Sequence, residues 1–144
     1  MNKIRVLFLC VHNSARSQMA EAYLNEIGKG SFEAESAGFE PGSLNPLAVE
    51  VMKEDGIDIS GNKIDSVYTF FSEKRFYGYI ITVCDESKAQ KCPIFPGVPV
   101  RYHWDIEDPA IFEGTYEEKL VKTRTVRGKI KGMIKDFIDE VYPG

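Results

Sequence analysis

Residues 4–24 read Ile-Arg-Val-Leu-Phe-Leu-Cys-Val-His-Asn-Ser-Ala-Arg-Ser-Gln-Met-Ala-Glu-Ala-Tyr-Leu. The apolar run that ends at Cys10 is typical of a buried strand, and the spacing of Met19 and Tyr23 predicts a helix that begins at Ser17. The segment from Cys10 to Ser17 therefore joins a strand directly to a helix. It carries one cysteine and one arginine six positions apart, a pair that points to anion chemistry.

The loop between this strand and this helix has the composition of an oxyanion site. A strand-to-helix turn aims several N–H groups at one point, where the helix dipole favours an anion and a thiolate. Arg16 can clamp two oxygens of the anion while the Cys10 sulfur attacks its central atom. The hydroxyls of Ser14 and Ser17 can donate hydrogen bonds to that sulfur. We expect the anion to be held by Val11, His12, Asn13, Ser14, Ala15, Arg16 and Ser17.

A packing role is the alternative for this cysteine, because a cysteine that ends an apolar strand is commonly buried in the core. A Cys-x5-Arg pattern alone is also short enough to arise by chance. The flanking strand and helix favour the functional interpretation. We interpret His12 as a structural loop residue and not as a base, since Arg16 and the helix end already activate the thiol.

The whole chain has 144 residues, of which 43% are hydrophobic, and this size suits one domain over residues 1–144. Its net charge of −4 without a basic run argues against a nucleic-acid or anionic-membrane partner. No apolar stretch is long enough to span a membrane and no signal peptide is apparent, so we expect a cytoplasmic monomer.

Three cysteines in a cytoplasmic protein indicate catalytic or redox groups better than a disulfide framework. Zinc is the competing interpretation. The chain has no Cys-x2-Cys pair, and its two histidines lie far in sequence from Cys84 and Cys92. We therefore expect no tightly bound cofactor.

Strands and helices alternate along the rest of the chain, which predicts an α/β fold with a parallel sheet flanked by helices. Ligands of such sheets bind at the carboxyl ends of the strands, so Cys10 and Cys84, which both end strands, should lie close together. The predicted elements are a strand over 32–37, a helix from Asn45-Pro46 to Gly56, a loop over 58–68, a short helix over 70–76, strands over 79–84 and 98–103, and a long helix over 117–141.

Cys84 and Cys92 lie eight residues apart across a polar segment. Eight helical residues span about 12 Å, whereas a disulfide needs Cα atoms within roughly 7 Å, so bonding would require local unwinding. With Cys10 the pair allows a chain of thiol exchanges, and the alternative is two unrelated thiols.

Asp108 precedes Pro109 in an acidic loop, where its carboxyl suits either a general acid above the Cys10 loop or a simple turn.

Several motifs together resemble one family. They are the loop from Cys10 to Glu21, Ser36-Ala-Gly, the run from Asn45-Pro46 to Ile59-Ser60, the Cys84/Cys92 pair before Pro93, and His103-Trp104 leading to Asp108-Pro109. This set resembles the arsenate reductases built on the low-molecular-weight protein tyrosine phosphatase fold. The resemblance runs from Val6 to about Ala110 and implies a single domain with a four-stranded parallel sheet.

The resemblance also implies a three-cysteine mechanism. Cys10 would attack arsenate held by Arg16, and Asp108 would protonate the leaving hydroxyl. Cys84 would then attack Cys10 and release arsenite, and Cys92 would resolve the resulting disulfide to Cys84–Cys92. A thioredoxin-like donor, or glutaredoxin with glutathione, would reduce that bond. The same resemblance implies a potassium ion near the loop, held by Asn13, Glu21, Ser36 and Asp65.

The chain departs from well-known members of this family at three points. They have a cysteine at the position of Ala15 and a glycine at that of His12, and their spacing from Cys84 to Cys92 is one residue shorter. Two other functions remain open. A phosphatase would need Cys10, Arg16 and Asp108 without the other cysteines, and a non-enzymatic redox or anion sensor would use the thiol pair as a switch.

Overall fold

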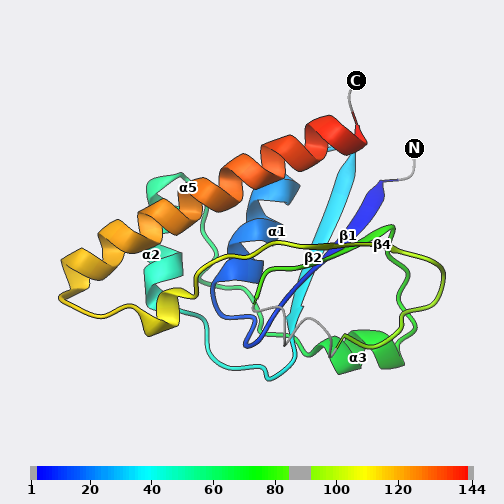
Figure 1. Ribbon diagram of the computed structural model, residues 1–144, viewed down its shortest axis with the longest axis horizontal. Coiled ribbons are helices and arrows are strands. Elements are labelled where there is room, and N and C mark those ends of the chain that lie inside the picture. Colours follow the sequence, from blue (N-terminus) through cyan, green and yellow to red (C-terminus); the bar gives the residue numbers. More distant parts are fainter. Residues whose placement is uncertain (1–2, 85–91, 143–144) are drawn as a thin grey trace.

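The computed structural model describes residues 3–84 and 92–142, and its centre is a four-stranded, all-parallel sheet with the strand order β2-β1-β3-β4 (Figure 1). The parallel α/β architecture expected from the alternating pattern is confirmed. The strands are β1 (Ile4–Cys10), β2 (Phe32–Gly38), β3 (Tyr79–Thr82) and β4 (Val100–His103). The helices are α1 (Arg16–Ile27), α2 (Pro46–Glu54), α3 (Val67–Ser72), the 3₁₀ turn η1 (Pro109–Ile111) and α5 (Tyr116–Val141).

Several predicted boundaries are wrong, among them the start of the strand expected over 98–103, which is β4 and begins at Val100. The short helix expected over 70–76 is α3, which starts at Val67, because the Ser66 hydroxyl caps it by accepting the Tyr68 N–H at 3.2 Å. The strand expected over 79–84 ends at Thr82. The chain nevertheless stays beside β1 for one more residue, since the Val83 N–H donates to the Leu9 carbonyl at 2.8 Å.

The sheet register brings three chain segments to one edge. Cys10, the last residue of β1, pairs with Gly38 on one side, and Leu9 pairs with Thr82 of β3 on the other. Parallel strands end at the same edge, so the Cys10 loop, the residues after β2 and the residues after β3 meet there. Ser66, the cap of α3, also pairs with Gly38 and joins this edge.

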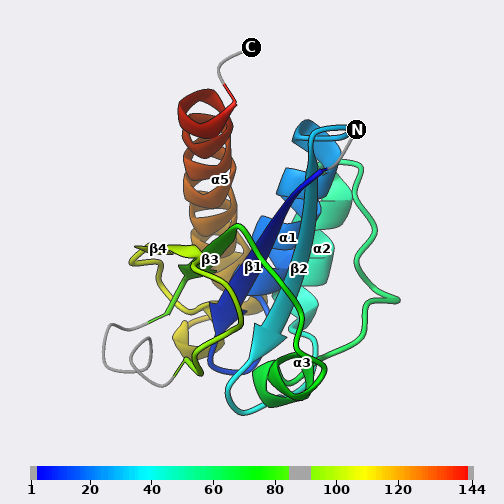
Figure 2. The same ribbon diagram turned by 90° about the vertical axis from the view of Figure 1, so that its right-hand side faces the viewer.

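Three helices pack on one face of the sheet. Figure 2 shows α1, α2 and α5 together on that face, with α3 and the loop after it on the other. The α5 ring of Phe137 contacts Phe32, Tyr79, Tyr102 and Trp104, with ring centres 5.2–6.2 Å apart, so this helix packs across several strands.

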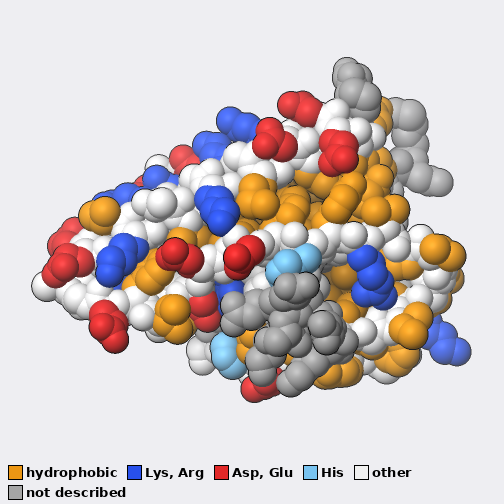
Figure 3. All heavy atoms as spheres, in the orientation of Figure 1, with side chains coloured by type: hydrophobic (Ala, Val, Ile, Leu, Met, Phe, Trp, Pro, Cys, Tyr) orange, Lys and Arg blue, Asp and Glu red, His pale blue; other side chains and the backbone are white. Residues whose placement is uncertain are grey.

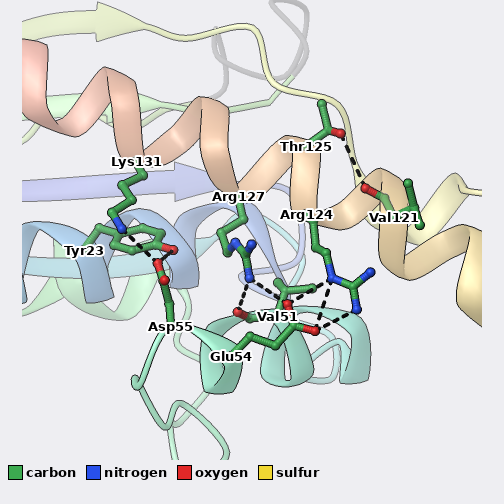
Figure 4. Close-up of polar contacts among 9 residues, drawn as sticks. All are labelled: Tyr23, Val51, Glu54, Asp55, Val121, Arg124, Thr125, Arg127 and Lys131. Atoms are coloured by element: carbon green, nitrogen blue, oxygen red, sulfur yellow. Dashed lines mark hydrogen bonds and ion pairs between the residues drawn. The ribbon is translucent and has the colours of Figure 1, made fainter.

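Ion pairs fasten α5 to α2 (Figure 4). Arg124 and Arg127 both contact the Glu54 carboxylate at 2.8 Å, and hydrogen bonds from Arg124 are the main reason why the pKa of Glu54 falls to about 2. One turn further along, the Asp55 carboxylate accepts from Tyr23 at 2.7 Å and from Lys131 at 3.1 Å. These contacts join α2 to α5 and, through Tyr23, to α1, the helix that directly follows the Cys10 loop.

The protein surface was expected to lack a basic patch, because the sequence has no basic run. On the face seen in Figure 3, acidic and basic side chains mix along α5, and neither sign forms a broad area. None of the helices in the described part of the chain has the length and apolar character needed to cross a bilayer.

Candidate active site

Cys10 is the last residue of β1 and only 2% exposed, and its sulfur is hydrogen-bonded to its own loop. The Ser17 hydroxyl lies 2.8 Å from this sulfur, and the Asn13 backbone N–H donates to it at 3.2 Å. The contact expected between Ser17 and the sulfur is therefore confirmed. The one expected from Ser14 is wrong: within the described structure Ser14 makes no bond to the sulfur, and its carbonyl instead accepts the Asn45 N–H at 3.0 Å.

The start of α1 supplies the electrostatics of the loop. This helix begins at Arg16, and the residue before it is Ala15, whose methyl group cannot cap the first turn. The orphan N–H groups of the first turn and the positive end of the helix dipole therefore remain directed at the loop. They favour an anion there and favour negative charge on the Cys10 sulfur.

Asn13 is the residue around which the loop is built. It is fully buried, and its φ of 55° lies in the left-handed region, which asparagine tolerates. Its side-chain oxygen accepts from Gln18 at 3.1 Å and from the Asp65 N–H at 3.0 Å, while its amide nitrogen donates to Ser17 at 2.8 Å and to Ser36 at 2.9 Å. All four hydrogen-bonding positions of the amide are used, so the Asn13 side chain buttresses its own loop.

The end of β2 presses directly against the loop. A Cβ atom on Gly38 would lie 2.8 Å from both the Asn13 nitrogen and the His12 carbonyl carbon, and 2.9 Å from the Val11 oxygen. Only glycine allows this approach. The Val11 carbonyl accepts the Glu40 N–H at 2.7 Å, which ties the loop to the chain after β2.

His12 has the structural role expected of it. Its Nδ1 lies 2.7 Å from the Glu40 carbonyl oxygen. Because a carbonyl only accepts, Nδ1 carries the proton in this contact. The exposed His12 also lines a small cavity beside Cys10, and its contact with Glu40 holds the loop to the segment after β2.

Arg16 and Asp108 face each other across the mouth of the loop. Arg16 is 5% exposed, with one guanidinium nitrogen donating to the Ile106 carbonyl at 3.1 Å and another 3.3 Å from the Asp108 carboxylate. Asp108 also caps η1 by accepting the Ala110 N–H at 2.9 Å. The turn interpretation of Asp108 is therefore confirmed, and the same turn places this residue at the cavity. The cavity is lined by Cys10, His12, Ser14, Ala15, Arg16, Asp108 and Ala110.

A group of oxygen atoms lies behind the loop. Ser36 donates to the Glu21 carboxylate at 2.7 Å and accepts from Asn13, whose oxygen receives the Asp65 N–H. The pKa of Glu21 is raised to about 7, mainly by burial and also by the negative charges of Asp65 and Glu35, while the Ser36 hydrogen bond opposes the shift. No lysine or arginine of the described residues forms an ion pair with Glu21.

Cys84 and Cys92 are both present as thiols. Cys84 is fully buried two residues after β3, and the bond from the Val83 N–H to the Leu9 carbonyl holds its segment beside the end of β1. Cys92 is partly buried and contacts Arg101 of β4. The unwinding expected between the two cysteines falls on residues 85–91, which lie outside the described residues.

Three residues of this region carried no signal in the sequence. Gln18, 1% exposed, donates to the Asn13 and Lys63 carbonyls, and Asn62 donates to the Gln18 side chain at 3.0 Å. Arg101 donates to the Cys92 sulfur. Only the position of Gln18 within the buried start of α1 could have indicated its role.

Comparison with known proteins agrees with this geometry. Residues 5–142 match the family of low molecular weight phosphotyrosine protein phosphatases. The chain is 40% identical to arsenate reductases of Shouchella clausii and Bacillus subtilis, covering 96% of this chain in both cases and 98% and 96% of those proteins. It is 33% identical to a glutaredoxin arsenate reductase of Synechocystis, over 95% of this chain and 98% of that one.

Solved structures show the same relationship. An arsenate reductase in its oxidized state is similar with a TM-score of 0.76 and 31% identity, covering 94% of this chain and 97% of that chain. A thioredoxin-dependent arsenate reductase of Corynebacterium glutamicum matches with a TM-score of 0.66 and 31% identity, over 93% of this chain and 61% of that one. A low molecular weight protein tyrosine phosphatase from T. tengcongensis, 24% identical over 96% of this chain and all of that one, shares the fold with a TM-score of 0.77. The chain therefore belongs to the low molecular weight phosphotyrosine protein phosphatase family and, within it, to the arsenate reductases.

Proposed function

We propose that the protein reduces arsenate to arsenite with Cys10, Cys84 and Cys92 as its electron-carrying thiols. The observation that carries this proposal is the placement of two thiols at one sheet edge. Cys10 sits in an anion-binding loop, and the buried Cys84 follows the neighbouring strand. A phosphatase needs only the first of these, because it transfers a phosphoryl group to water and moves no electrons.

The first step joins arsenic to sulfur. The loop N–H groups and Arg16 hold the arsenate oxygens, and the Cys10 thiolate attacks arsenic. An As–S bond forms as one oxygen leaves as water, taking its proton from Asp108. The 3.3 Å contact between Arg16 and Asp108 supports this pairing of roles, because it holds the acid beside the group that binds the anion.

The second step moves the electrons. The Cys84 thiolate attacks the Cys10 sulfur, a Cys10–Cys84 disulfide forms, and the As–S bond breaks with its electron pair left on arsenic, which departs as arsenite. Cys92 then attacks Cys84, giving a Cys84–Cys92 disulfide and restoring the Cys10 thiolate. Ser17 and the Asn13 N–H, which contact the Cys10 sulfur, stabilise that leaving thiolate.

A dithiol protein of the thioredoxin type is the donor that we propose for reducing the Cys84–Cys92 bond. The similarity to a thioredoxin-dependent relative supports this choice, and the similarity to a glutaredoxin arsenate reductase keeps glutathione with glutaredoxin as the second candidate. We also propose a monomer, because the groups that would bind and activate the anion, Cys10, Arg16 and Asp108, lie together within one folded chain. Thiols that must be re-reduced in every cycle suit the cytoplasm.

We further propose a bound potassium ion behind the loop. Asn13, Glu21, Ser36 and Asp65 carry the oxygen atoms that a hard cation prefers, and the ion would replace one of the two hydrogen bonds that the Asn13 side-chain oxygen accepts. Glu21 is a largely buried carboxyl without a basic partner among the described residues. These residues therefore fit such an ion. When bound it would supply positive charge that favours ionised Glu21, and the chain's own Asn13 amide would still position Ser17 against the Cys10 sulfur.

The test measures arsenite formed from arsenate by purified protein with thioredoxin, thioredoxin reductase and NADPH, beside a mixture of glutathione and glutaredoxin. Turnover with either mixture supports the proposal and identifies the donor. The variant Cys92→Ser should complete one turnover and stop as a Cys10–Cys84 disulfide. Absence of turnover with both, together with cleavage of an aryl phosphate that survives in a Cys84→Ser, Cys92→Ser double variant, would make the protein a phosphatase.

A further inference from the structure

The Cys92 sulfur lies against an arginine from the edge of the sheet. Arg101 donates from one guanidinium nitrogen to the Cys92 sulfur at 3.2 Å and from another to the Pro93 carbonyl oxygen at 3.4 Å. The Cys92 S–H donates to that same carbonyl at 3.4 Å. One planar fork thus contacts both the thiol and the backbone directly after it, which is a geometry that only arginine supplies.

Arg101 is well placed to hold a loop cysteine in position. It lies in β4, where it pairs with Ile80 of β3, so its backbone belongs to the regular sheet. Its neighbour Tyr102 packs on Phe137 of α5, and side chains alternate along a strand, so Arg101 projects from the opposite face. Arg101 is exposed, so its contact with Cys92 lies at the protein surface.

The electrostatic surroundings of Cys92 have two opposing parts. Burial raises the pKa of the Cys92 thiol, while the hydrogen bond and the charge of Arg101 lower it. Arg101 is the charged side chain that acts on this sulfur in the described part of the protein. The two effects together leave the pKa of the thiol above its ordinary value, and removal of Arg101 would raise this pKa further.

We propose that Arg101 is a positioning residue for the resolving step, holding the Cys92 sulfur and stabilising its thiolate for attack on Cys84. This inference rests on the proposed reductase function. In the step, a Cys84–Cys92 bond forms, the Cys10–Cys84 bond breaks, and the electron pair leaves with the Cys10 sulfur. The proton of Cys92 has already passed to solvent, and no outside oxidant is consumed.

The first experiment isolates Cys92. In a Cys10→Ser, Cys84→Ser background it is the remaining cysteine of the chain, and the rate of its alkylation by iodoacetamide against pH reports its thiolate without any need for arsenate. Arg101→Met should move the midpoint to higher pH and slow alkylation at pH 7 by roughly three- to tenfold, with an unchanged plateau at high pH. Arg101→Lys should recover part of the loss.

The control for this experiment is Lys135→Met, which removes an exposed positive charge from α5, and its midpoint should match that of the parent. An unchanged midpoint in Arg101→Met would overturn the proposal. So would a lowered plateau without a shifted midpoint, because that result would mean altered access to the sulfur and not altered ionisation.

The second experiment follows the resolving step in the three-cysteine enzyme. After acid quenching during turnover, peptide mapping should find the Cys10–Cys84 disulfide enriched several-fold in Arg101→Met and less so in Arg101→Lys. Equal amounts in parent and variant would remove Arg101 from this step. A parent that turns over no arsenate would refute the proposed function instead, and the alkylation midpoints would still decide whether Arg101 controls the Cys92 thiolate.

Discussion

Glu21 offers a sharp test of the electrostatics behind the catalytic loop. Burial raises its pKa in the folded protein to about 7 from an ordinary value of 4.5. The folded state therefore holds this proton more tightly than the unfolded state does. Its contribution to stability is present in full below pH 4.5 and is lost as the pH rises towards 7. The difference corresponds to about 3 kcal/mol, of which about 2.5 kcal/mol falls between pH 5 and pH 8.

The assay is urea unfolding at pH 5 and pH 8 in choline chloride, for the wild type and for Glu21→Gln. The glutamine retains an oxygen that can accept from Ser36 but cannot ionise, so its free energy of unfolding should change less over this range, by about 2 kcal/mol. Subtracting the variant removes the contribution of every other titrating group.

Potassium provides the second arm of the same assay. An ion that binds the ionised carboxyl stabilises the folded state by mass action, so replacing choline with potassium should raise the stability of the wild type at pH 8 and not that of Glu21→Gln. Equal pH dependence of the two proteins in choline would refute the raised pKa. An equal response of both proteins to potassium would refute the ion site while leaving the pKa argument standing.

Three further predictions concern the loop itself. Ser17→Ala removes a donor to the Cys10 sulfur, so alkylation of Cys10 by iodoacetamide at pH 7 should slow about tenfold, and an unchanged rate would contradict the role of this hydroxyl. Gly38→Ala places a methyl group 2.8 Å from the Asn13 nitrogen, so the free energy of unfolding measured in urea should fall by about 1–3 kcal/mol. An unchanged free energy of unfolding would mean that the loop backbone can shift to make room for the methyl group. Asp108→Asn should slow arsenate reduction by about a hundredfold in single-turnover assays. The anion affinity measured by calorimetry should be unchanged or higher, because Arg16 loses a competing carboxylate. A rate equal to that of the wild type would leave Asp108 with its role in the turn only.

Much of the fold could be predicted because its signals are local. The apolar run before Cys10, the Asn45-Pro46 cap and the spacing within the last helix each depend on neighbours within a turn or two, and β1, α2 and α5 lie where these patterns place them. The start of α3 was missed because its signal is a single hydroxyl, Ser66, in a polar stretch that resembles a loop.

In the candidate active site, too, local features could be predicted and contacts between distant residues could not. The nucleophile, its arginine and the helix end lie in one continuous segment, so the chemistry of the Cys10 loop follows from their order in the chain. The partners of each group lie far away in sequence. Two serines stand near Cys10, and nothing local distinguishes Ser17, which contacts the sulfur, from Ser14, which does not.

What the sequence by itself determined is the parallel α/β class, the oxyanion loop from Cys10 to Ser17 and the three thiols that a relay would need, because these rest on short-range periodicity and on residue chemistry. What only the tertiary structure decided is the set of contacts between distant segments. Arg101 reaches Cys92 because β4 lies at the sheet edge, and the pKa of Glu21 is high because folding buries its carboxyl near Asp65. Burial and distance tune these groups, and both exist only once the chain is folded.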